Sequence, residues 1–170
     1  MSKVVPGRYT AQMDDSFVVF HIGMRINRLW AVHKWLPVFM AMPRMIKELY
    51  INRELGFLDG SYHLSWRGVL LVQYWSSFEQ LEKYARHGEN HLKAWRDFNR
   101  SIGTDGTVGI FHETYLIPQG QYEAVYNNMP ISGLAKAGMH VPAVGKKETA
   151  GRRLGLNREP AVPSPPNPKA

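Results

Sequence analysis

Short strand-like runs of apolar residues alternate along the chain with stretches that show the 3.6-residue period of a helix, and the order of these changes limits the fold more than any other feature. The predicted order is strand, helix, strand, strand, helix, strand, at residues 17–24, 29–55, 61–66, 68–75, 78–102 and 108–117. This order is typical of the ferredoxin-like βαββαβ unit, an α+β fold with helices on one face of a four-stranded antiparallel sheet.

Two prolines divide the first helical stretch. Pro37 and Pro43 each lack an amide donor and disfavour helix at the preceding residue. We therefore predict two helical pieces within residues 29–55 rather than one helix.

The second helical stretch is predicted to run without interruption from Phe78 to Ile102, with Ser76 or Ser77 as its N-cap. Its charged and apolar side chains fall on opposite arcs. The apolar arc carries Leu81, Tyr84, Ala85, His91, Leu92, Trp95 and Phe98. His91 is therefore expected to point inward, although a break at Gly88 would change its direction.

A histidine in an apolar interior is either held by a hydrogen bond, used as a ligand, or used as an acid or base near neutral pH. One reading makes His91 a structural residue that bonds a backbone carbonyl, and the other makes it line a pocket with Tyr84, Trp95 and Phe98 as walls. His87 lies four residues earlier, but no acidic general base lies on the same arc between them, so we predict no metal site and place His87 at the surface.

The last predicted strand is apolar on both sides, which suggests that a second subunit covers the open face of the sheet. Alternation sends His112 and Thr114 to one face and Glu113 and Tyr115 to the other. His21 on the first strand could pair with His112, while Glu113 and Tyr115 are expected in an interface network.

Methionines and aromatics gather in the first helical stretch, where they form either plain core or an adaptable wall for an apolar ligand. They are Met40, Met42, Met45, Trp30, Trp35 and Phe39. The sequence has no phosphate-binding loop, Rossmann fingerprint or nucleophile elbow, so nucleotide-dependent chemistry lacks support.

Composition narrows the class of protein. With 170 residues and no cysteine, the chain can close one substantial core, without disulfides or thiolate chemistry. Seven of the 21 Lys and Arg residues lie after Ala135, against two Glu, so this tail supplies +5 of the net charge of +7. We therefore expect no nucleic-acid partner. No apolar stretch is long enough for a membrane span, and a cytoplasmic location is expected.

The expected organisation has three parts. Residues 1–14 are predicted to be a polar leader, and residues 15–130 a ferredoxin-like domain. Residues 131–170 are predicted to be a C-terminal extension, packed at first and disordered from about Lys146 onward.

Several longer motifs of the sequence resemble those of a known enzyme superfamily. The segment Val72-Gln73-Tyr74-Trp75-Ser76-Ser77, followed by a helix with His87 and His91, resembles the antibiotic-biosynthesis monooxygenase superfamily. The branch that it resembles is typified by the monooxygenase of the fumagillin pathway, over about residues 15–155, through residues 24–27, 33–37, 109–115 and 122–123.

The resemblance implies a homodimeric α+β barrel that uses O₂ to oxidise a hydrophobic metabolite in secondary metabolism. We expect the pocket of such an enzyme to be shaped by Tyr84, Trp95, Phe98, Trp75 and Met45. On this reading His91 is the general base or a proton shuttle, and Arg25, at the end of the first predicted strand, could stabilise an enolate-like anion; many members of the wider superfamily need no prosthetic group. The alternatives are a haem-binding oxygenase or dehydratase-like enzyme with His91 as axial ligand, and a non-catalytic binding module for hydrophobic metabolites.

Overall fold

The computed structural model describes residues 3–156 and 158–168, and the chain divides into two compact units. The central unit comprises Val18–Tyr115, and the terminal unit comprises the segments before and after it. The sequence predicted one ferredoxin-like domain over residues 15–130. In the structure the central unit ends earlier, at Tyr115, within the last strand of its sheet.

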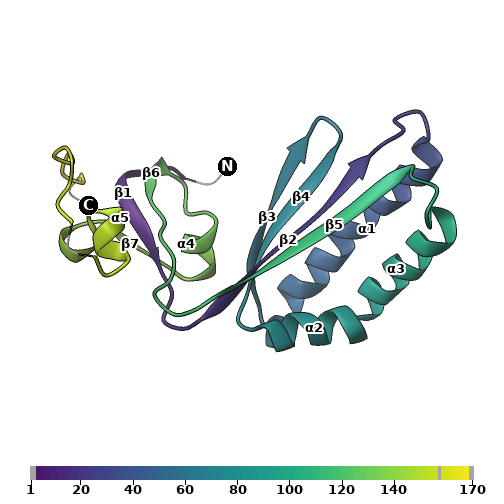
Figure 1. Cartoon of the computed structure of the whole chain (residues 1–170), viewed down its shortest axis with the longest axis horizontal. Helices are drawn as coiled ribbons and strands as arrows, with labels where there is room; N and C mark the ends of the chain where they lie inside the picture. Colours follow the sequence, from purple (N-terminus) through teal and green to yellow (C-terminus); the bar gives the residue numbers. More distant parts are fainter. Residues whose placement is uncertain (1–2, 157, 169–170) are drawn as a thin grey trace. The chain divides into compact units, whose positions relative to one another are not determined.

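The central unit has the ferredoxin-like order of elements predicted from the sequence. They are β2 (Phe17–Ile26), α1 (Val32–Ile51), a short 3₁₀ turn η1 (Arg53–Leu55), β3 (Phe57–Ser65), β4 (Gly68–Trp75), α2 (Phe78–His87), α3 (Glu89–Ser101) and β5 (Val108–Ile117). The strands lie in the order β3-β4-β2-β5, and β4 is antiparallel to both β3 and β2. The three helices lie along one side of this sheet (Figure 1).

The register between β2 and β4 decides which side chains face the helices. Paired residues point to the same face, and the pairs on the helix side are Val18 with Trp75, Phe20 with Gln73, Ile22 with Leu71 and Met24 with Val69. Most of these side chains belong to the buried core, together with Met42, Ile46 and Leu49 from α1. The residues between them, such as His21 and Arg25, therefore lie on the opposite, open face.

The prediction of two helical pieces at residues 29–55 was wrong, because α1 continues through Pro37 and Pro43. Both prolines lie on the exposed side of the helix. The buried side chains Met42, Ile46 and Leu49 are three or four residues apart and form one continuous apolar stripe. Burial of this stripe outweighs the backbone hydrogen bonds that the prolines cannot make.

The prediction of one helix from Phe78 to Ile102 was also wrong, because Gly88 separates α2 from α3. The predicted N-cap is confirmed, since the Ser77 hydroxyl accepts a hydrogen bond from the Gln80 amide at 3.3 Å. At Gly88 the backbone is extended, and a Cβ atom would lie 2.7 Å from the Tyr84 carbonyl oxygen and 2.8 Å from its ring. Glycine thus allows α3 to start against Tyr84.

The terminal unit contains a second, smaller sheet. Its elements are β1 (Val5–Gln12), β6 (Tyr126–Met129), α4 (Leu134–Ala137), β7 (Met139–Pro142), η2 (Gly145–Lys147) and α5 (Ala150–Arg153). The strands lie in the order β6-β1-β7.

Two expectations are corrected in this unit. Residues 5–12, expected to belong to a polar leader, form the central strand β1, with Thr10 and Ala11 buried. Disorder was expected from Lys146 onward, yet Arg153 pairs with Glu123 and donates to the Lys147 carbonyl at 2.7 Å. Residues 1–2, 157 and 169–170 of these predictions lie outside the described part of the chain. In the part described, no helix combines the length and apolar character needed to cross a membrane.

Candidate functional site

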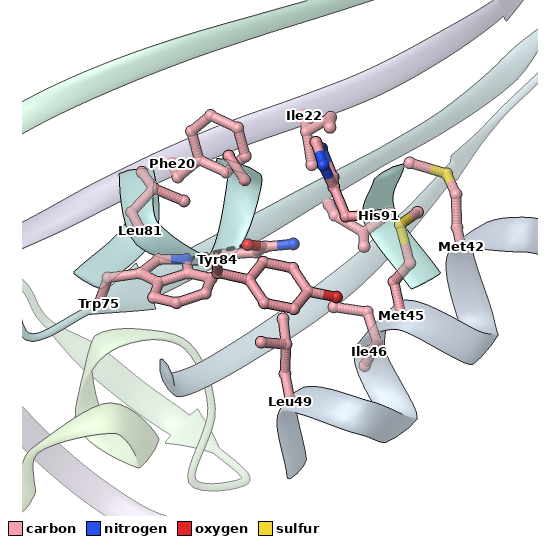
Figure 2. Close-up of a pocket in the computed structure, with 13 residues that line it drawn as sticks. Phe20, Ile22, Met42, Met45, Ile46, Leu49, Trp75, Leu81, Tyr84 and His91 are labelled. Carbon is pink, nitrogen blue, oxygen red and sulfur yellow. Dashed lines mark hydrogen bonds between the residues drawn. The ribbon is translucent and has the colours of Figure 1, made fainter. Parts of the chain in front are cut away.

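A small cavity of about 50 Å³ lies in the central unit between the helices and the sheet. Its lining comes from β2, β4, α1, α2 and α3, and Figure 2 shows these side chains converging on one space. The lining is apolar except at Gln73, Tyr84, His91 and the indole nitrogen of Trp75, and consists otherwise of Phe20, Ile22, Met42, Met45, Ile46, Leu49, Leu71, Leu81 and Ala85. A mostly apolar pocket with a few polar groups is typical of small-molecule sites.

The small cavity adjoins a cleft of about 710 Å³ in the same unit. The two share the lining residues Phe20, Ile22, Met42, Met45, Leu81, Ala85 and His91. On α3, the rings of Trp95 and Phe98 stack with centroids 5.8 Å apart and form an aromatic wall of the cleft. The volume is within the range of small-molecule pockets, so an apolar ligand can occupy the cleft and reach into the cavity.

His91 lies at the junction of the two spaces, in the first turns of α3. Its Nδ1 atom is buried and has no hydrogen-bond partner among the described residues. Burial lowers the pKa of His91 below its usual value, while the backbone at Ala85 and the carboxylate of Glu48 act in the opposite direction. The neutral imidazole is therefore favoured.

Tyr84 is held in place by a residue of α1. Its hydroxyl donates a 2.9 Å hydrogen bond to Oε2 of Glu48, and its ring centroid lies 5.9 Å from that of His91. Burial and the Glu48 carboxylate both raise the pKa of Tyr84, so its hydroxyl stays protonated and committed to Glu48. Tyr84 thus forms a fixed wall beside His91.

Two residues were missed by the sequence analysis: Gln73, which lines the small cavity, and Glu48, which accepts the hydrogen bond of Tyr84. Gln73 lies on the buried face of β4, and its Oε1 accepts a 2.9 Å hydrogen bond from Nε1 of Trp75, drawn dashed in Figure 2. The signal for Gln73 was a polar residue alternating with Leu71 and Trp75 along one face of a strand. Glu48 had no comparable signal, because its contact with Tyr84 spans 36 positions.

The structure brings six of the seven predicted site residues together. Tyr84 and Trp75 line the small cavity, Trp95 and Phe98 line the cleft, and His91 and Met45 line both. Arg25 does not join them. It is exposed and pairs with Gly68 on the open face of the sheet, because it follows Met24, whose side chain points toward the helices. Arg25, which was expected to stabilise an enolate-like anion, therefore lies on the opposite face of the sheet from His91.

The polar residues of β5 divide between the two faces as alternation predicted. His112 lies against Phe20 on the cleft side, with ring centroids 5.7 Å apart. On the open face, the Tyr115 hydroxyl donates to Oε2 of Glu113 at 2.7 Å, and His21 Nδ1 is 3.8 Å from the same oxygen. A pair between His21 and His112 is thus not formed, because the two rings are on opposite faces.

The remaining metal hypothesis involves His87, which is exposed as predicted. Within residues 3–156 and 158–168, no three His, Asp or Glu side chains are grouped so that they could hold a metal ion. For haem, Nδ1 of His91 is buried, so of the two ring nitrogens Nε2 is the one that would hold the iron.

Comparison with known proteins gives one family. The family model described as "Monooxygenase af470-like" matches residues 17–134. The monooxygenase af470 of Aspergillus fumigatus is 33% identical, over 75% of this chain and 53% of its own length. The chain therefore spans about half the length of this curated relative.

Two solved structures share the fold. A crystal structure of the aldoxime dehydratase OxdRE in complex with butyraldoxime has a TM-score of 0.64 and 16% identity, over 82% of this chain and 41% of that one. Another crystal structure of aldoxime dehydratase has a TM-score of 0.63 and 16% identity, over 79% of this chain and 40% of that one. At this identity the likeness concerns the fold alone.

Proposed function

The chain belongs to the monooxygenase af470-like family, and we propose on that basis that it is a small O₂-dependent monooxygenase that oxidises a hydrophobic metabolite. The observation that carries the proposal is the position of His91. Its imidazole is the titratable group at the junction between a buried cavity and an apolar cleft, where a substrate would lose water as it enters.

His91 acts as the general base in this proposal. Because Nδ1 is buried, Nε2 is the atom that meets the substrate, and the lowered pKa keeps the imidazole neutral and ready to accept a proton near neutral pH. Removal of a proton from a phenol or from carbon next to a carbonyl leaves an electron-rich anion that can reduce O₂.

The overall reaction balances without an external reductant. The substrate loses two hydrogens, both from a CH₂ group next to a carbonyl or, in a phenol, one from the O–H and one from a ring C–H, and that carbon becomes a carbonyl; one atom of O₂ enters the carbonyl, and the other leaves as water. The chain contributes positioning and exclusion of water, through the apolar walls supplied by Met42, Met45 and Phe20.

The proposal is tested by O₂ uptake of the purified protein with a panel of polycyclic phenols and aryl ketones. We expect uptake that depends on substrate and a product that gains one labelled atom from ¹⁸O₂. An absorption spectrum is recorded first: a Soret band with about one haem per chain, lost in His91→Ala, would replace this mechanism by haem chemistry. Tight ligand binding without O₂ uptake across the panel would instead indicate a binding module.

We further propose that a second copy of the chain covers the open face of the central sheet. On this face Phe111 is 47% exposed and lies over Gly23, where an added Cβ would be 2.5 Å from its ring. Val72 and the Glu113–Tyr115 pair lie on the same face. An open sheet face with large apolar side chains is commonly buried by oligomerisation.

The dimer is tested by sedimentation equilibrium. We expect twice the chain mass of 19.5 kDa for the wild type, and a shift to the single-chain mass in Phe111→Lys, because a buried lysine without a partner is costly. Ile51→Lys, at an exposed residue at the end of α1, is the matched control and should leave the mass unchanged. A wild type that sediments as a single chain at micromolar concentration would contradict the proposal.

A further inference from the structure

The side chain of Gln73 is more completely buried than a glutamine usually is. It is 6% exposed and lies on β4 between the buried residues Leu71 and Trp75. Buried amides normally have their donors and acceptors satisfied, because an unpaired polar group loses its hydrogen bonds to water.

Only one end of this amide is used within the described part of the chain. Oε1 accepts the indole N–H of Trp75, which fixes the orientation of the planar group. No described residue accepts a hydrogen bond from Nε2, although Gln73 lines the small cavity. Two N–H donors are therefore left beside a cavity whose walls are otherwise almost entirely apolar.

The other polar groups at this cavity are already committed or serve as acceptors. The Tyr84 hydroxyl donates to Glu48, and the Trp75 indole N–H donates to Gln73 itself. The imidazole of His91 is favoured in its neutral form and supplies a base. By elimination, Nε2 of Gln73 is the donor that remains for a ligand oxygen.

We propose that the small cavity holds the oxygen of the substrate, and that Nε2 of Gln73 donates a hydrogen bond to it. This inference rests on the proposed function and names its substrate class: an apolar molecule with a hydroxyl or carbonyl oxygen at one end. The oxygen enters first, and the apolar body remains in the cleft against Trp95 and Phe98, because the cavity and the cleft share one set of lining residues.

In this position the amide of Gln73 provides a hydrogen-bond donor for the substrate anion. For a phenol, the hydroxyl proton moves to His91 and the electron pair of the O–H bond stays on the oxygen. The Nε2 donors of Gln73 then face the oxygen that carries the developing charge. Gln73 thus takes the role that the sequence had assigned to Arg25, which lies on the other face of the sheet.

The test compares two ligands of nearly equal shape, 2-naphthol and 2-methylnaphthalene, by titration calorimetry. The measured quantity is the ratio of their dissociation constants. We expect Gln73→Met to weaken the binding of 2-naphthol about tenfold relative to that of 2-methylnaphthalene, because the hydrogen bond is lost only for the ligand that has an oxygen. Gln121→Met, at an exposed glutamine of the terminal unit, is the matched control and should leave the ratio unchanged.

The ratio separates binding from structure, since loss of the acceptor for Trp75 would weaken both ligands alike. If Gln73→Met does not fold, the side-chain amide resonances of Gln73 in the wild type provide the readout by ¹⁵N–¹H NMR. They should move downfield with 2-naphthol and not with 2-methylnaphthalene. An unchanged ratio in a folded variant, or amide resonances that respond equally to both ligands, would overturn the inference.

Both measurements are made in the absence of O₂ and hence without turnover, so they fail independently of the proposed reaction. A Gln73-dependent preference for 2-naphthol without any O₂ uptake would retain the oxygen site and refute the monooxygenase. O₂ uptake without a Gln73-dependent preference for 2-naphthol would retain the monooxygenase and refute the oxygen site.

Discussion

Replacement of His91 by alanine should lower the rate of substrate-dependent O₂ uptake by about 10²- to 10⁴-fold, the usual contribution of a positioned general base. The side chain lies at the junction of cavity and cleft, and none of the other residues that line the small cavity offers a free base, because Tyr84 is protonated and bonded to Glu48. The measurement is the initial rate at saturating substrate, together with KM.

His87→Ala is the matched control for this variant. His87 ends α2, only four positions from His91, but its side chain is exposed and lines neither space. Its rate should equal that of the wild type. A His91→Ala enzyme with more than about a tenth of the wild-type rate would exclude His91 as the base.

The pH dependence of the rate also tests the role of His91 as general base. Burial holds the pKa of His91 below 6.5, so the neutral, active form persists to lower pH than for an exposed histidine. The rate should therefore be constant through neutral pH and fall on acidification only below about pH 6.5. A rate that already falls between pH 8 and 7 would contradict a base with a lowered pKa.

Replacement of Trp75 by alanine should lower the free energy of unfolding by about 3–5 kcal/mol, the cost of removing a large aromatic side chain from a core. Trp75 is 0% exposed and packs against Phe57 and Tyr84, with ring centroids 5.6 and 5.8 Å away. Its indole also holds Gln73, whose acceptor would lose its partner. Urea denaturation followed by circular dichroism measures the change.

Trp66→Ala provides the comparison within the same hairpin. Trp66 lies in the turn between β3 and β4 and is 87% exposed, so its removal should change the free energy of unfolding by less than about 0.5 kcal/mol. Equal losses of stability in the two variants would show that Trp75 is not part of the core.

The order of strands and helices in the central unit was predictable because each element shows a local pattern of apolar residues, either a helical period or a short strand-like run bounded by turn residues. That signal is local, as is the Ser77 cap, and both agree with the structure. The continuity of α1 was not predictable in the same way. The penalty of Pro37 and Pro43 is visible in the sequence, whereas the burial that compensates it depends on the sheet beneath the helix.

Strand β1 shows a related limit. Its residues are polar enough to suggest a leader, and its hydrogen-bonding partners are more than 100 positions away, in β6 and β7. Main-chain hydrogen bonds between such distant segments leave no periodic mark in either one, so this sheet was missed.

The sequence by itself determined the ferredoxin-like order and the shared face of His91, Trp95 and Phe98 on one helix, because these follow from local patterns along single elements. The direction of that face was predicted from one continuous helix, whereas the structure begins α3 anew after Gly88, so the packing of α3 decided it. Only the tertiary structure decided which face of β2 and β4 meets the helices. Both faces of β2 are rich in apolar residues, so alternation alone could not tell whether Arg25 or Met24 would point toward His91. Packing of the helices against Met24, Leu71 and Trp75 settled this, which removed Arg25 from the site and placed Gln73 in it.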